Sequence, residues 1–188
     1  MKTKLTFVSG NELKIKEVKE ILKEHDIESI KLEIPETQGS DEEVVKEKAK
    51  LACDELNRPV FVDDTSLCFK ALNGLPGHYI RVFMDKLRLD DIVKLLDGFE
   101  DKTAYAVCNI CYCEPGKDPI VFKGEVKGKI IEPTGMKEFS WDPIFLPDGS
   151  KKTYGEMTTE EKNKISHRRK ALLKFNDYLK QINKGKQK

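Results

Sequence analysis

An α/β domain with a central mixed sheet is the fold that this sequence predicts, and three patterns predict it. Short apolar runs that are typical of buried strands alternate with amphipathic helical segments in the first part of the chain. Two long extended stretches come later, at 103–113 and 120–131, and a helical segment ends the chain. No repeat or linker interrupts the 188 residues, so we expect a single domain, 1–188, with two lobes.

The first part of the chain is expected to alternate strands and helices. Strands are expected at residues 4–9, 27–34 and 60–62, the last being very short and ending abruptly at two aspartates. A helix follows the first strand, with Ile15, Val18 and Leu22 on one face, and a second helix is expected at 41–56.

The second part combines short helices with a hairpin. Helices are expected at residues 79–87, 90–96 and 166–182, the last with an apolar stripe of Leu172, Leu173, Phe175 and Leu179. Stretch 120–131 alternates charged and apolar residues, so it should pair with 103–113 as an antiparallel hairpin with one solvated face. Residues 158–161 resemble a capping box that opens another helix.

Charge and hydropathy exclude two classes of function. The chain has 34 Lys and Arg against 33 Asp and Glu, a net charge of +1, whereas proteins that hold nucleic acid electrostatically carry a clear basic excess. No apolar run is long enough to span a bilayer, and polar residues interrupt any signal-like start. We therefore expect a cytoplasmic protein that binds neither nucleic acid nor membranes.

Five cysteines, at positions 53, 68, 108, 111 and 113, invite comparison with a zinc site. On the strand expected at 103–113, Cys111 and Cys113 face one side and Cys108 the other. The three thiols therefore cannot converge on one ion without a turn. Buried, reduced thiols are the interpretation that we favour.

Ser9, Gly10 and Asn11 lie at the junction of the first strand and helix, with Lys14 in the first helical turn. A glycine there lets the backbone approach a ligand closely. The helix N-terminus offers free amide groups, and Lys14 adds a full positive charge. The pattern favours a bound anion, but Asn11 also suits an ordinary helix N-cap.

Asp63, Asp64 and Thr65 follow the apolar run 60–62 directly. Ligands of open α/β sheets collect at the carboxyl ends of strands, where these two carboxylates are expected to lie. Adjacent acids are costly unless a positive group compensates them, and Mg²⁺ is the natural partner. A solvated turn is the alternative, which the fully apolar run makes less favourable.

Three charged residues elsewhere suit either a site or an ordinary surface. Glu36 could supply a second carboxylate to the same ion. Lys48 and Arg81 lie on expected helices, where a solvated cation is the default interpretation.

Two further segments also have two interpretations. Residues 139–143, Phe-Ser-Trp-Asp-Pro, suit a stacking platform for a base with Asp142 as a hydrogen-bond acceptor, or a core around Trp141. Residues 166–169, Ser-His-Arg-Arg, suit donors toward a purine carbonyl or an anion, or a helix cap with surface cations.

Taken together, these segments resemble the inosine triphosphate pyrophosphatase family of nucleotide house-cleaning enzymes. The resemblance covers nearly the whole chain, in order: TFVSGN (6–11), VDDTSL (62–67), LPG (75–77), FSWDPIF (139–145), EMT (156–158), EKN (161–163) and SHR (166–168). Motifs that are weak singly are specific when they occur together at family-like spacing.

The resemblance implies an elongated two-lobed α/β fold with a nucleotide cleft between the lobes, and a homodimer. It implies hydrolysis of ITP, dITP and XTP to the monophosphate and pyrophosphate, which cleanses the nucleotide pool, with Mg²⁺ or alternatively Mn²⁺. The residues that match triphosphate-binding positions are Ser9, Gly10, Asn11, Lys14, Lys48, Asp64, Thr65 and Arg81. Those that match the base pocket are Phe139, Ser140, Trp141, Asp142, Lys162, His167 and Arg168. Glu36 and Asp64 match the metal-binding acids.

These matches suggest a mechanism. Water would attack the α-phosphorus with Asp63 or Asp64 as the general base, while Mg²⁺ held by Glu36 and Asp64 offsets the developing charge. Lys14 and Lys48 would stabilise the departing pyrophosphate. Two alternatives stay open: a pyrophosphatase for pyrimidine or modified triphosphates, and a nucleotide sensor that does not turn over.

One position departs from the resemblance. Many members of the family have glycine where this chain has Ser140. If the backbone there needs a positive φ, serine carries a strain penalty at the edge of the predicted base pocket.

Overall fold

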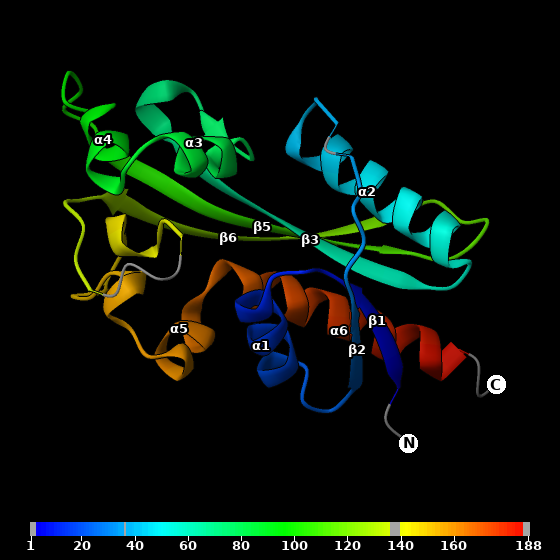
Figure 1. Ribbon diagram of the computed structural model, residues 1–188. Coiled ribbons are helices and arrows are strands. Elements are labelled where there is room, and N and C mark those ends of the chain that lie inside the picture. The colour runs from blue at the N-terminus through cyan, green and yellow to red at the C-terminus, as the bar shows by residue number, and fades with distance from the viewer. Residues whose placement is uncertain (1–2, 36, 136–139, 186–188) are drawn as a thin grey trace. The chain divides into compact units, whose positions relative to one another are not determined.

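The computed structural model describes residues 3–35, 37–135 and 140–185 and contains a seven-stranded sheet flanked by helices (Figure 1). The strands follow the order β2-β1-β3-β5-β6-β7, and β4 pairs with β3. β1 is parallel to β2 and β3, whereas β4 and β7 are antiparallel to their neighbours. The predicted α/β fold with a mixed sheet is therefore confirmed.

The elements have the following bounds. The strands are β1 (Lys4–Val8), β2 (Asp26–Ile30), β3 (Val60–Phe69), β4 (Pro76–Gly77), β5 (Thr103–Cys113), β6 (Ile120–Ile130) and β7 (Phe145–Pro147). The helices are α1 (Glu12–Ile21), α2 (Asp41–Leu56), α3 (Ile80–Lys86), α4 (Leu89–Lys94), α5 (Thr159–Ile165) and α6 (His167–Gly185). Short 3-10 turns occur at Lys70–Leu72, Asp142–Ile144 and Tyr154–Glu156.

The chain folds into two compact units, each with its own core. The first unit comprises Met1–Asp64, Cys108–Gly124 and Arg168–Lys188. The second comprises Thr65–Val107 and Glu125–His167. The expectation of a single domain over 1–188 stays a prediction.

The first unit buries apolar side chains on both faces of its strands. On one face, α1 and α6 pack against Phe7 and Phe61, whose rings stack at 4.8 Å. On the other face, where α2 lies beside β3 (Figure 1), residues of α2 pack with Val60 and Val62. Successive side chains of a strand point to opposite faces, so this alternation in β3 also fixes where the next two residues point.

The strand predicted to end at residue 62 instead continues to Phe69, so that prediction was wrong. Asp63 and Asp64 lie inside β3, not in a turn beyond its end. β1 pairs with β3 at Phe7 and Phe61 and ends at Val8, so Asp63 lies level with the residues that follow β1. The two aspartates therefore lie beside the carboxyl end of β1, and not at the carboxyl end of β3 as predicted.

The second unit is built around a cluster of aromatic and aliphatic side chains. Trp141 contacts Phe145 edge-on at 5.8 Å, and Tyr154 lies 5.0 Å from Phe145. Residues from α3 and α4 pack against the same cluster. The capping box predicted at 158–161 is confirmed, because Thr158 and Glu161 bond each other's backbone amides at the start of α5.

Most other expected elements are confirmed, with small changes. β5 and β6 are neighbours, and Lys123, Lys127 and Lys129 lie on the exposed face of β6. In α6, Leu173 is 39% exposed and does not belong to the apolar stripe, whereas Ala171, Leu172, Phe175 and Leu179 are buried. No helix within the described ranges has both the length and the apolar character needed to cross a membrane.

The cysteines of β5 lie as their spacing predicts. Cys108 belongs to the α1 and α6 side of the sheet, and Cys111 and Cys113 belong to the α2 side. All three are buried free thiols, as is Cys53, and burial raises the pKa of Cys108 and Cys111 to about 12. The interpretation as buried, reduced thiols is confirmed.

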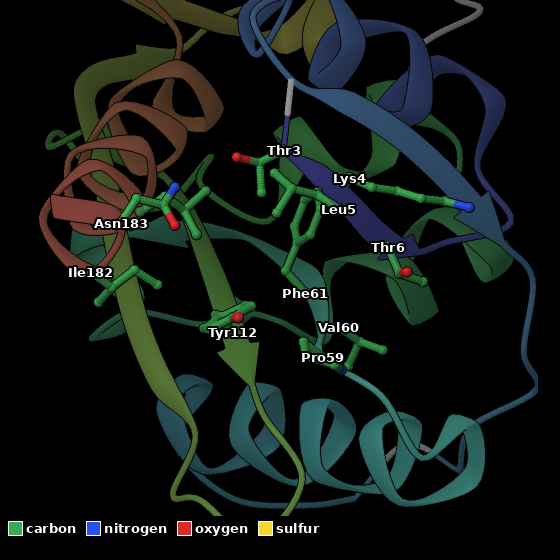
Figure 2. A pocket seen from close by; sticks show the side chains of 11 residues that line it. Thr3, Lys4, Leu5, Thr6, Pro59, Val60, Phe61, Tyr112, Ile182 and Asn183 are labelled. Carbon is green, nitrogen blue, oxygen red and sulfur yellow. The ribbon is translucent and has the colours of Figure 1, made fainter. Parts of the chain in front are cut away.

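A small pocket opens in the first unit where β1 and β3 begin (Figure 2). Leu5, Val60 and Tyr112 line it, with Ile182 and Asn183 from the end of α6. Residues 9–11 follow the opposite end of β1. The pocket is therefore separate from the residues that the sequence singles out for chemistry.

Candidate active site

The loop between β1 and α1 is organised by its own hydrogen bonds. The Asn11 Oδ1 accepts from the backbone amides of Leu13 and Lys14, each at 3.1 Å, and the Asn11 amide donates to Ser9 Oγ at 3.2 Å. The N-cap interpretation of Asn11 is therefore confirmed. The expectation of free amides needs correction, because these three already have partners. Lys14 adds a full positive charge beside these capped amides.

Gly10 is explained by close approach. A Cβ at this position would lie 3.0 Å from Cγ of Lys31, whose methylene groups cover the glycine. A larger residue would displace that side chain. Sequence patterns did not single out Lys31, because nothing local links it to the loop.

Asp63 lies at the centre of a buried network in the first unit. Its Oδ1 accepts from Lys14 Nζ at 3.1 Å, and its Oδ2 accepts from Nε and Nη2 of Arg168 at 3.2 and 3.1 Å. The Nη1 of Arg168 donates to Glu17. Glu17 was missed at the sequence level, because an acid on a charged helix gives no sign that it will be buried.

The charges in this network shift the pKa of their neighbours. Burial by itself would raise the pKa of Asp63, but the positive charges of Lys14, Arg168 and Lys48 outweigh it and lower the pKa to about 2. Burial would lower the pKa of Arg168, whereas Glu17 and Asp63 raise it. Asp63 is therefore ionised at neutral pH and a weak proton acceptor.

Asp64 points to the α2 side of the sheet. Its Oδ1 lies 4.0 Å from Lys48 Nζ, which also donates to the backbone carbonyl of Asp63 at 3.3 Å. The two carboxylates therefore lie on opposite faces of β3, Asp63 beside Lys14 and Arg168 and Asp64 beside Lys48. Lys14, Arg168 and Lys48 supply the positive charge that two adjacent acids were expected to require. Magnesium as a further partner of the pair stays a prediction.

The predicted metal site is described only in part. Glu36 lies outside the described residues, as does Phe139 of the predicted base pocket. Within the described ranges, no group of three or more His, Cys, Asp or Glu side chains is arranged to hold a metal ion. Asp64, with 20% of its side chain exposed, is the described member of the predicted pair of ligands.

The second unit brings together several residues of the predicted base pocket. Lys162 Nζ donates to Asp142 Oδ2 at 2.5 Å, and each side chain is only 5% exposed. The His167 ring lies 5.5 Å from Trp141 and 5.7 Å from Tyr154. Tyr154 is an addition that the sequence did not indicate. It also lies under the Lys162 ammonium, 5.4 Å from the ring centre.

The segment around Trp141 bears out two structural expectations. Trp141 is 4% exposed among the rings of the core, which supports its interpretation as a core residue. Ser140 has a φ of 51°, in the left-handed region that favours glycine. Serine at this position therefore carries the strain that was expected if φ were positive.

The remaining site residues stay predictions. Thr65 and Arg81 belong to the second unit, with Arg81 on the exposed side of α3. Arg168, which the resemblance matches to the base pocket, belongs to the first unit and bonds Asp63 and Glu17.

The fold and this cluster of charges define an α/β protein that concentrates lysines and aspartates beside a strand-to-helix loop. The model of the Ham1 family matches residues 5–178, and the chain belongs to that family. It is 49% identical over 178 residues to the "Inosine triphosphate pyrophosphatase" of Aspergillus fumigatus, covering 94% of each chain. It is 45% identical to the protein of the same name from Puccinia graminis f. sp. tritici, over 94% of this chain and 96% of that one.

Solved structures agree with this assignment. "Structure of a HAM1 protein from Coxiella burnetii" superposes with a TM-score of 0.84 at 29% identity, over 95% of this chain and 99% of that one. The family resemblance carried by the seven sequence motifs is therefore confirmed.

The lowered pKa of Asp63 predicts acid sensitivity with a defined sign. The folded pKa of about 2 is below the ordinary 3.8. The ionised Asp63 therefore stabilises the folded protein fully above pH 3.8, and this stabilisation is lost as the pH falls toward 2. The free energy of unfolding of the native protein, relative to Asp63→Asn, should decrease by about 2 kcal/mol across this window. Urea unfolding at several pH values measures it, and parallel curves for the two proteins would contradict the network.

Proposed function

We propose that the chain hydrolyses inosine-type purine nucleoside triphosphates, namely ITP, dITP and XTP, to the monophosphate and pyrophosphate. The observation that carries the proposal is its similarity, over 94% of its length, to relatives named inosine triphosphate pyrophosphatase. The cluster of two lysines and two aspartates beside the loop after β1 supports it, because it supplies charges suited to a triphosphate.

Lysines are the proposed triphosphate ligands. Lys14 and Lys48 are 20% and 27% exposed, so part of each side chain is open to a ligand. Ser9, Gly10, Asn11, Thr65 and Arg81 complete the proposed set. As pyrophosphate departs, negative charge develops on its oxygens, and ammonium groups nearby stabilise it.

A divalent cation, Mg²⁺ or alternatively Mn²⁺, is part of the proposal, with Asp64 and Glu36 as its protein ligands. Mg²⁺ is usually held by one or two carboxylates together with substrate phosphates and water, not by a cage of protein ligands. A partly exposed Asp64, without a larger group of ligands in the described ranges, fits that mode. When bound, the ion would neutralise charge on the phosphates.

Of the two aspartates, we assign the role of general base to Asp64. Both oxygens of Asp63 accept hydrogen bonds from cations, and its pKa of about 2 makes it a poor acceptor for a proton from water. Asp64 lies on the opposite face and is partly exposed. It would take the proton of the water that attacks the α-phosphorus.

The buried pair of Asp142 and Lys162 suggests how the base is selected. Hypoxanthine presents a carbonyl at C6 and an N–H at N1, which match an ammonium donor and a carboxylate acceptor. Adenine presents an amino group and a bare nitrogen, so both protein groups would lose partners. Sites of this kind discriminate by roughly 10⁴-fold or more. Ser140, Trp141, His167 and Phe139 belong to the same proposed pocket, and a homodimer remains part of the proposal.

Pyrophosphate release from a panel of triphosphates tests this function. ITP and XTP should be cleaved rapidly with Mg²⁺ and not with EDTA, while ATP and GTP are cleaved slowly. Guanine presents the same groups at C6 and N1 as hypoxanthine, so slow cleavage of GTP requires an additional penalty at its 2-amino group. Orthophosphate as the product, or a preference for dUTP, would contradict the proposal. Tight binding of ITP without any turnover would identify a sensor instead.

The variant Asp64→Asn tests whether Asp64 takes part in the mechanism, as the general base or as a ligand of the ion. It should fold normally but lower kcat for ITP by about 10² to 10⁴-fold, the range for loss of general acid–base catalysis. Asp54→Asn, at an exposed position of α2, is the matched control and should leave kcat unchanged. Normal turnover in Asp64→Asn would remove Asp64 from the mechanism.

A further inference from the structure

One face of α1 carries both a proposed substrate ligand and a buried acid. Lys14 and Glu17 are three residues apart, so they are neighbours on the same helical face. Lys14 bonds one oxygen of Asp63, and Glu17 bonds Arg168, which in turn bonds the other oxygen of Asp63. The four side chains therefore form a linear chain of alternating charge, in the order Lys14, Asp63, Arg168 and Glu17.

The burial of this chain makes its members depend on one another. Glu17, Asp63 and Arg168 are 4%, 2% and 1% exposed. A single buried charge is strongly unfavourable unless it is paired and hydrogen-bonded. The two carboxylates and two cations have a net charge of zero. Lys14 is the most exposed member, at 20%.

The order of the contacts gives each member a different task. Glu17 holds Arg168, and Arg168 uses two of its nitrogens on one oxygen of Asp63. The carboxylate then has its other oxygen directed to Lys14. A guanidinium engaged in this way can fix orientation as well as supply charge, since its donors form a rigid planar fork.

We infer that Glu17 and Arg168 are positioning residues, which set the place of the Lys14 ammonium by holding Asp63 from the far side. This inference rests on the proposed function, since it takes Lys14 to be a ligand of the triphosphate. It gives Arg168 a role that differs from contact with the base. Neither residue touches the reacting atoms in this scheme.

The variant Glu17→Gln tests the inference, because it keeps the shape and removes the charge that holds Arg168. KM for ITP with Mg²⁺, and Kd for ITP in EDTA by calorimetry, should both rise about tenfold, which is the effect of losing one charged hydrogen bond. A change in kcat smaller than that in KM is expected. Glu20→Gln, at an exposed position of the same helix, is the control and should match the native protein.

A purely structural role would give a different result. In that case Glu17→Gln would lower the free energy of unfolding and the active fraction while KM and Kd stay unchanged, and the inference would be overturned. A double-mutant cycle adds a second criterion: in a Lys14→Met background, Glu17→Gln should have no further effect on Kd. An undiminished effect there would show that Glu17 does not act through Lys14.

A conservative variant keeps the test decisive if Glu17→Gln does not fold. Glu17→Asp retains the charge but withdraws the carboxylate by one methylene group, and it should give a smaller rise in KM. Unchanged KM in folded Glu17→Asp would count against the inference.

If the native protein neither binds nor cleaves ITP, the proposed function fails, whereas native activity with unaffected variants rejects this inference alone.

Discussion

The ionised carboxylate of Asp63 is the group on which the arrangement of the first unit depends. A carboxylate that is 2% exposed is tolerated only because Lys14 and Arg168 bond its two oxygens. Those cations come from α1 and α6, so the compensation of one charge joins two helices at one point of β3. Glu17 completes the charge balance around Arg168. The network therefore links the start of α1 to the strand that carries both aspartates.

The pleat of β3 gives two adjacent aspartates different surroundings. Phe61 and Asp63 face α1 and α6, while Val62 and Asp64 face α2 and Lys48. Asp63 is buried and both of its oxygens accept hydrogen bonds, so it is suited to a structural role. Asp64, partly exposed, is suited to chemistry in the proposed mechanism. Residues with the same side chain thus acquire separate roles through strand alternation alone.

Local signals in the sequence were sufficient for most of the fold. The helix 41–56 and the capping box at Thr158 depend on residues within one turn of each other, so they could be predicted with their bounds. β3 was predicted too short, because two acids after an apolar run are typical of a turn. The cations that allow them inside a strand come from distant segments, and no local pattern reveals them.

The candidate site was predictable only in its outline. Motifs in register identified the family, and with it the lysines and aspartates. The burial of Glu17 was not predictable, since its partner Arg168 lies 151 residues away in the chain. Tyr154 was missed for a similar reason, because its contacts with Trp141 and His167 join separate segments.

A direct measurement of the pKa of Asp63 tests the central claim that cations from two helices stabilise its ionised form. Carbon-13 NMR of protein labelled at the aspartate carboxyl groups would follow the titration, with Asp63→Asn used to assign the signal. A pKa of about 2, well below the ordinary 3.8, is the expected result. A pKa at or above 3.8 would mean that burial outweighs the cations, and that they do not stabilise the ionised form.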